Sequence, residues 1–94
     1  MTTTKNTRKK YTRATFIASK KILTDQKEIA TFLNTYGTGY DKKHPYPAVY
    51  VYADCYYIYQ QKDGTFLCEI ANCYEEGTLE KCEVYLWKWA KDEL

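Results

Sequence analysis

The sequence predicts a small α+β domain, in which an antiparallel sheet of about four strands in the order β-α-β-β-β carries one helix on one face. Residues 47–71 contain two runs typical of β-strands, separated by a tight turn at Asp63-Gly64. Residues 25–36 have the spacing of an amphipathic helix. With 94 residues, 45% of them hydrophobic, the chain has enough apolar surface for one core and too little for two.

The folded part is expected to be a single domain of residues 11–94, preceded by a flexible basic tail of residues 1–10. The tail contains four Lys/Arg and no large apolar residue after the initiator Met. Charge is distributed unevenly over the rest of the chain as well. Residues 1–44 carry ten Lys/Arg and three Asp/Glu, whereas residues 45–94 carry four and nine, so the net charge of +2 hides two regions of opposite sign.

The first expected strand covers about residues 11–18. Its small and apolar residues fall at every second position: Ala14, Phe16 and Ala18. A helix is the alternative for this segment, because Ala14, Ile17 and Ile22 also lie near one helical face.

A helix over residues 25–36 is the clearest prediction. Asp25 is suited to cap its start, and Glu28 follows three residues later, as in a capping box. The apolar stripe has the spacing i, i+3, i+4, i+7: Ile29, Phe32, Leu33 and Tyr36. We expect this stripe to pack on the sheet, and Gly37 to end the helix in the left-handed conformation.

A tyrosine-rich strand follows a loop at residues 37–47, and six of the eleven tyrosines lie between Tyr46 and Tyr59. A strand of this length is expected to bulge or bend near Ala53-Asp54. The more apolar face should contact the helix: Val49, Val51, Ala53, Cys55, Tyr57 and Tyr59. The other face is predicted to present three rings outward as partner-binding residues: Tyr50, Tyr52 and Tyr56.

The last element, residues 79–91, fits two patterns. As a strand it places four side chains on one face, which would join the binding surface: Glu83, Tyr85, Trp87 and Trp89. As a helix it has an apolar stripe capped by Thr78: Leu79, Cys82, Leu86 and Ala90. The helical alternative changes the order of elements to β-α-β-β-α.

No motif for catalysis, a cofactor or a metal is present. The chain lacks the glycine-rich phosphate and dinucleotide loops, the nucleophile elbow and the zinc-protease helix motif. Four cysteines, at positions 55, 68, 73 and 82, contain no C-x-x-C pair, and the only histidine is His44. We expect free thiols that act as small buried apolar groups, with a disulfide between facing strands as the second alternative and a metal site as the third. The chain is therefore predicted not to be an enzyme.

The location expected from the sequence is the cytoplasm. The N-terminus is polar and lacks the apolar core of a signal peptide, and no run approaches the roughly 20 apolar residues of a membrane span. The last four residues, 91–94, spell the KDEL signal of the endoplasmic reticulum. We interpret this match as coincidental, and expect no membrane partner.

Two functions follow from these features. The first is recognition of a host protein or nucleoprotein complex through aromatic and acidic residues, including Glu69 and Glu83 beside the rings. The second is binding of single-stranded nucleic acid, with tyrosines stacking on bases and six basic residues following the phosphates: Arg8, Lys9, Lys10, Arg13, Lys42 and Lys43. A homodimer through a long aromatic edge strand is also open.

In size and in its lack of motifs, the chain resembles the small proteins with which phages and mobile elements block host machinery, anti-CRISPR proteins among them. The resemblance is one of type and is carried by no particular residues. It implies a non-enzymatic inhibitor or adaptor that binds a host component, and this is the function we expect.

Overall fold

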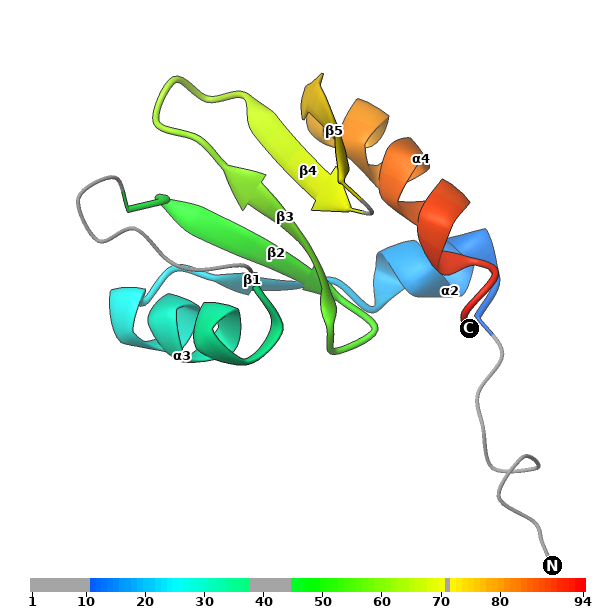
Figure 1. The fold of residues 1–94 in the computed structure, drawn as a ribbon, viewed down its shortest axis with the longest axis horizontal. Helices are drawn as coiled ribbons and strands as arrows, with labels where there is room; N and C mark the ends of the chain where they lie inside the picture. Colours follow the sequence, from blue (N-terminus) through cyan, green and yellow to red (C-terminus); the bar gives the residue numbers. More distant parts are fainter. Residues whose placement is uncertain (1–10, 38–44, 71) are drawn as a thin grey trace, which may run out of the picture.

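The computed structural model describes residues 11–37, 45–70 and 72–94 (Figure 1). The elements follow in the order α2 (Arg13–Ala18), β1 (Lys21–Leu23), α3 (Gln26–Tyr36), β2 (Ala48–Tyr52), β3 (Tyr56–Gln60), β4 (Phe66–Ile70), β5 (Cys73–Gly77) and α4 (Leu79–Ala90). The expected tail, as well as Lys42 and Lys43, lies outside the described residues. None of the helices in the described parts is long and apolar enough to cross a membrane.

The five strands form one antiparallel sheet in the order β1-β2-β3-β4-β5, so that each strand lies beside its neighbour in the sequence. The α+β class is confirmed, with five strands where about four were expected. The last element is a helix, which was the alternative prediction. The edges of the sheet are β1 and β5. The tyrosine strands β2 and β3 are interior, and an edge-to-edge homodimer through them is therefore blocked by their neighbours.

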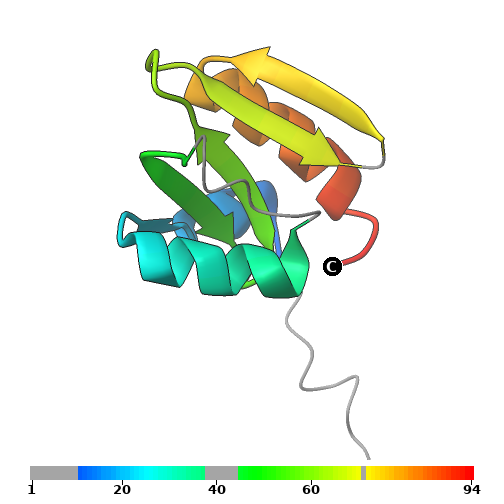
Figure 2. The same ribbon diagram turned by 60° about the vertical axis from the view of Figure 1, so that its left-hand side comes forward.

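Helices cover both faces of the sheet, whereas one helix on one face was expected. Helix α3 lies on the face beside β1 and β2, and α4 lies along β3, β4 and β5 on the opposite face (Figures 1 and 2). The short helix α2 shares the face of α4, and contacts both α4 and β2. The core is accordingly divided into two clusters, one on each side of the sheet.

The core cluster under α3 agrees with the expected face of the tyrosine strands. Its buried residues are Ile29, Leu33, Val49, Val51 and Tyr59. Phe32 and Tyr57 pack against it and are partly buried. The apolar stripe of α3 thus meets Val49, Val51, Tyr57 and Tyr59 as predicted, although its last member, Tyr36, is 50% exposed. Ala53 and Cys55, which were expected on the same face, lie instead in the turn between the strands, and Ala53 packs against the cluster on the opposite side of the sheet.

Asp25 caps helix α3 as predicted, since its side chain accepts a hydrogen bond from Lys27 N–H at 3.0 Å. The donor is Lys27 and not Glu28, the residue with which a capping box was expected. The end of the helix differs. Gly37 has φ −90° and ψ 179°, which is extended and not left-handed. A Cβ atom at this position would lie 2.8 Å from the Leu33 carbonyl oxygen, so glycine is needed there for close approach of the backbone.

The segment expected as a first strand is the helix α2. Thr12 and Thr15 form a reciprocal capping box at its start, in which each side chain accepts a hydrogen bond from the other residue's backbone N–H. Phe16 is completely buried, with its ring stacked on Tyr52 at a centroid distance of 5.4 Å. The short helix α2, which begins at this capping box, thus places the Phe16 ring in the core.

The long tyrosine strand is divided into β2 and β3 by a tight turn, where a bulge or bend was expected. Ala53 and Asp54 have φ of 49° and 67°, and Tyr52 pairs directly with Tyr56 across the turn. The second expected turn, at Asp63-Gly64, is confirmed. Gly64 has φ 90° and donates its N–H to the Gln61 carbonyl at 3.0 Å.

Candidate protein-binding surface

The face on which Tyr50, Tyr52 and Tyr56 lie is covered, so the prediction that these rings point to solvent is wrong. Tyr52 is completely buried, and the other two are partly buried in the cluster under α2 and α4. Tyr50 meets Phe66 edge-on at 5.4 Å. The physical reason is that α4 buries its own apolar side on this face of the sheet and so covers the tyrosines.

Tyr52 and Glu83 belong to a polar network that links β2, α4 and the connection between α2 and β1. The Tyr52 hydroxyl donates to Glu83 Oε2 at 2.6 Å, and Lys20 Nζ lies 3.1 Å from the same oxygen. Burial and the neighbouring Glu83 carboxylate raise the pKa of Tyr52, so the phenol stays protonated. The Glu83 side chain is only 13% exposed. It stabilises the fold and offers little to a partner.

Tyr56 is occupied in a similar way at the C-terminus. Its hydroxyl donates a hydrogen bond to Glu93 Oε1, and burial together with this carboxylate raises its pKa. Leu94 packs against the cluster under α4. Two of the four residues that spell KDEL therefore contact the body of the domain.

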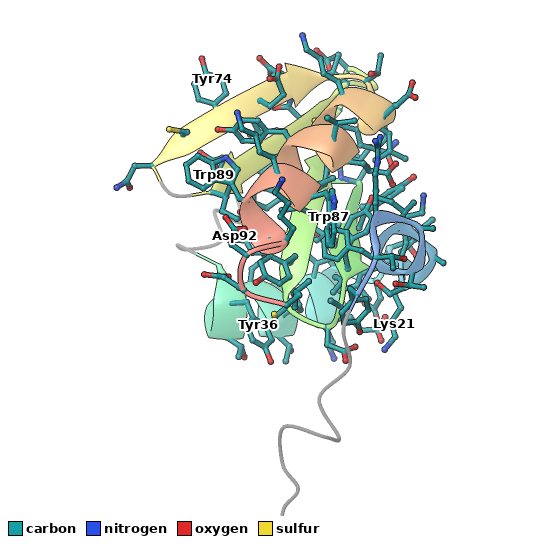
Figure 3. The ribbon with its side chains drawn as sticks, turned by 90° about the vertical axis from the view of Figure 1, so that its right-hand side faces the viewer. Lys21, Tyr36, Tyr74, Trp87, Trp89 and Asp92 are labelled. Carbon is teal, nitrogen blue, oxygen red and sulfur yellow. The ribbon has the colours of Figure 1, made fainter. Side chains whose placement is uncertain are left out.

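Trp87 does not share a face of α4 with Tyr85 and Trp89, because residues two positions apart in a helix are separated by about 200°. Trp87 turns toward α2 and packs on Phe16 at a centroid distance of 5.1 Å. Tyr85 and Trp89, one helical turn apart, meet at 6.4 Å on another side. Figure 3 shows Trp89 and Tyr74 on the flank next to β5, away from Trp87.

Exposed large side chains gather where β5 runs beside α4. Tyr74 on β5 is 67% exposed, and on α4 Val84 and Trp89 are 46% and 38% exposed. Tyr85, which meets Trp89, is half-buried. Two exposed acidic side chains, Glu69 on β4 and Glu76 on β5, accompany the rings. We call these six residues the β5/α4 surface: Glu69, Tyr74, Glu76, Val84, Tyr85 and Trp89.

An open groove of about 460 Å³ runs along the α4 side of this surface. Its lining includes Val84, Tyr85 and Lys88 from α4 and Glu75 from β5. Lys81 bridges the two walls, with Nζ 3.3 Å from a Glu75 carboxylate oxygen. Opposite charges are thus balanced in the groove, while its apolar side chains stay accessible.

The acidic charge of the surface lies on the other face of β5. Tyr74 pairs with Glu69 and Glu76 pairs with Leu67, so these four side chains stand on the face opposite α4. Glu76 accepts a hydrogen bond from the Gln61 amide at 2.7 Å, which holds its carboxylate without neutralising it. Glu69 is near enough to Tyr57 to raise the pKa of that phenol, after the larger effect of burial.

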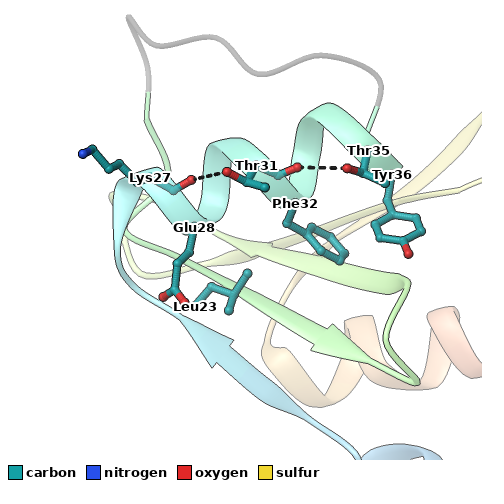
Figure 4. Close-up of a pocket in the computed structure, with 7 residues that line it drawn as sticks. All are labelled: Leu23, Lys27, Glu28, Thr31, Phe32, Thr35 and Tyr36. Carbon is teal, nitrogen blue, oxygen red and sulfur yellow. Dashed lines mark hydrogen bonds between the residues drawn. The ribbon is translucent and has the colours of Figure 1, made fainter.

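A second open groove, of about 510 Å³, lies beside α3 (Figure 4). Leu23, Phe32 and Tyr36 give it an apolar floor. Its threonines are not free donors, because Thr31 and Thr35 donate to carbonyl oxygens one turn earlier in the same helix. It contains one acid and one base, Glu28 and Lys27, and therefore has no charge that would select a partner.

Of the residues predicted to bind protein, Glu69, Tyr85 and Trp89 remain accessible. Tyr85 and Trp89 contact each other on α4, whereas Glu69 lies on the other face of the sheet, beside Tyr74. Among the predicted nucleic-acid contacts, Arg13 is exposed on α2. The remainder of that set lies outside the described residues: Arg8, Lys9, Lys10, Lys42 and Lys43. Sequence reasoning missed Tyr74 and Val84. Asn72, which has φ 65° before β5, was the signal for the missed strand, since asparagine tolerates this conformation.

The described residues contain no group of three or more His, Cys, Asp or Glu placed to hold a metal ion. Cys68 and Cys82 are buried, and the expectation that cysteines fill the core is confirmed for these two. Burial raises the pKa of Cys68 to about 12 and that of Cys82 to about 11. Cys73 is exposed and Cys55 is half-buried.

Comparison of the chain with family models, with curated proteins and with solved structures found no match.

Proposed function

We propose that this chain is a non-enzymatic interaction domain that binds another protein through the β5/α4 surface. In its biological class we propose a small inhibitor or adaptor of a phage or mobile element, anti-CRISPR in type, whose target is a host protein or a nucleoprotein complex. The observation that supports binding is that exposed rings and acids flank the edge strand β5 on both of its faces, with Glu69, Tyr74 and Glu76 on one side and the exposed side chains of α4 on the other. Among the residues that the structure describes, five large apolar side chains are exposed, and three of them, Tyr74, Val84 and Trp89, lie on β5 or α4.

Physical chemistry favours such a surface as an interface. Tyrosine and tryptophan bury a large area at little cost in conformational entropy, and they are enriched among residues that dominate binding energies. Tyr74 and Trp89 lie outside the buried core, whereas the rings of Phe16 and Tyr52 are fully buried in it. The surface is acidic on one side, so a target with basic residues is expected to associate faster and more specifically.

The alternative function, binding of single-stranded nucleic acid, has less support. A stacking platform needs rings that are open to bases, and Tyr50, Tyr52 and Tyr56 are covered. Glu69 and Glu76 would repel phosphates from the exposed ring of Tyr74. Arg13 on α2 is the described residue that favours this alternative.

The proposed function is tested by affinity capture from a lysate of the native host, with three forms of the full chain as bait. These are the wild type, the double variant Tyr74→Ser with Trp89→Ser, and the control Tyr36→Ser. Tyr36 is 50% exposed but lies on α3, away from the proposed surface. We expect one protein in stoichiometric amount with the wild type and the control, and its loss with the double variant.

Capture that is equal for all three baits would contradict the proposed surface, and capture of nucleic acid alone would favour the alternative. Because both substituted rings are exposed, the double variant should keep the stability of the wild type, which circular dichroism would check.

A further inference from the structure

Strand β5 is an edge of the sheet, and the direction of its unpaired backbone groups follows from the register. Gln61 N–H donates to the Thr65 carbonyl at 2.8 Å, which makes this a hydrogen-bonded pair between β3 and β4. Backbone groups of an antiparallel strand point alternately to either side. The backbone groups of Thr65 point toward β3, so those of Cys68, three positions later, point toward β5. There Cys68 is paired with Glu75.

The same alternation places the backbone N–H and C=O groups of Tyr74 and Glu76 on the free side of β5. These are also the two residues whose side chains stand on the acidic face with Glu69. A peptide that adds to this edge would consequently lie with its directly opposed residues beside Tyr74 and Glu76.

The residues between these positions would face the other way, toward α4. There an added strand would meet Val84 and Tyr85, which line the groove together with Glu75 of β5. Trp89 is exposed on the flank of α4 that lies next to β5 (Figure 3). The two sides of the edge thus differ in chemistry. One presents the carboxylates of Glu69 and Glu76 and the phenol ring of Tyr74, which have no basic partner among the described residues. The other presents a groove in which Val84 and Tyr85 stand among charges that balance one another.

We propose that β5 accepts an extended segment of a partner protein as a sixth strand, with Lys or Arg at every second position and apolar residues between them. This rests on the proposed function and specifies how the partner is bound. The basic residues lie opposite Tyr74 and Glu76, where a carboxylate pairs with the cation and the exposed ring accepts it over its face. The apolar residues fill the groove beside α4.

A second copy of this chain is a poorer occupant of the same edge. In full overlap of two β5 strands, Glu75 would lie opposite Glu75, and like charges placed opposite each other destabilise a sheet. Every such pairing also brings together two surfaces that each carry Glu69 and Glu76. Charge complementarity therefore selects a basic segment.

The proposal is tested by selecting random nine-residue peptides, displayed on phage, against the immobilised full chain. Selected peptides are then measured with three variants. Glu76→Lys reverses the charge, Glu76→Pro removes an N–H that no strand of this sheet uses, and Glu28→Lys makes the same charge change on α3. Proline is tolerated at an edge position of this kind, and circular dichroism shows whether the variant is folded. Glu76→Lys retains the N–H and keeps the test decisive if the proline variant unfolds.

We expect enriched peptides with Lys or Arg at alternate positions, whose affinity falls roughly tenfold with either substitution at Glu76 and is unchanged by Glu28→Lys. Amide exchange of Tyr74 and Glu76 should be fast in the free chain and slow in the complex. Absence of enrichment, basic residues without the two-residue period, or an equal loss with Glu28→Lys would overturn the proposal. Slow exchange of both amides without peptide would overturn it too, because a second copy would then occupy the edge.

The two proposals fail in different ways. If a captured protein depends on Tyr74 and Trp89 but is unaffected by Glu76→Pro, the protein-binding function stands and addition of a strand is wrong. If no protein is captured with the wild type, the proposed function itself is contradicted.

Discussion

Tyr52 shows how a single residue can be misread from the sequence alone. In the pattern of its strand it stands on the more polar face, between Tyr50 and Asp54, and such a tyrosine is typical of a surface. In the structure its ring is stacked on Phe16, and its hydroxyl meets a carboxylate that arrives from α4, 31 positions later in the sequence. Only the path of the chain after β5 decides its environment.

Substitution of Tyr52 by Phe should lower the free energy of unfolding by about 1–3 kcal/mol. The change keeps the ring and removes a hydroxyl that donates to a charged group, while Glu83 stays largely buried with one partner fewer. Urea unfolding at pH 7 measures the effect.

The control for this substitution is Tyr36→Phe, at an exposed position, which should change stability by less than about 0.5 kcal/mol. In the double variant with Glu83→Gln, the two losses should not add, because both changes disrupt one network. Additive losses would mean that the bond between Tyr52 and Glu83 contributes nothing of its own.

At the scale of elements, α3 and α4 differ in how clearly their sequences predict a helix. Helix α3 has one period and one cap, and both its existence and its buried face could be predicted. Residues 79–90 fit a strand as well as a helix, since alternation and a helical stripe coexist there. The helix is chosen because Cys82, Leu86 and Ala90 then reach the same core cluster.

Short elements are the least predictable. Helix α2 has six residues, too few for a periodic pattern, and β1 has three. Their positions depend on partners distant in sequence, such as Tyr52 for Phe16 and β2 for β1. The candidate site was equally hard to predict from the sequence, because β5 and α4 become neighbours only through the turn at Gly77.

The cap of α4 gives a prediction at this scale. Thr78 Oγ1 accepts a hydrogen bond from Lys81 N–H at 3.2 Å. Replacing Thr78 by Ala should cost about 0.5–2 kcal/mol in the free energy of unfolding, whereas Thr78→Ser should cost little. Thermal unfolding followed by circular dichroism compares the two, and an alanine variant as stable as the serine variant would argue against the cap.

For the whole molecule, the buried thiols and phenols predict a loss of stability at alkaline pH. In the folded chain burial raises the pKa of Cys68 to about 12 and of Cys82 to about 11, from ordinary values of 9.0. Above pH 9 the unfolded chain loses these protons and the folded chain keeps them. Stability is thus fully present below pH 9 and falls as the pH rises further.

We expect the free energy of unfolding to fall by about 2–3 kcal/mol between pH 8 and pH 10, measured in urea with a reductant present. The variant Cys68→Ala, which has one buried thiol fewer, should show a smaller fall over the same range. A free energy that stays level to pH 10 would show that the thiols ionise equally in both states.

We propose that this domain binds its partner at the β5/α4 surface and not through the tyrosine face of β2 and β3. Hydrogen exchange of the full chain, alone and in complex with its captured partner, separates these two surfaces. We expect binding to slow exchange in residues 73–77, with little change in α3. Protection centred on β1 and α3, with residues 73–77 unchanged, would contradict it.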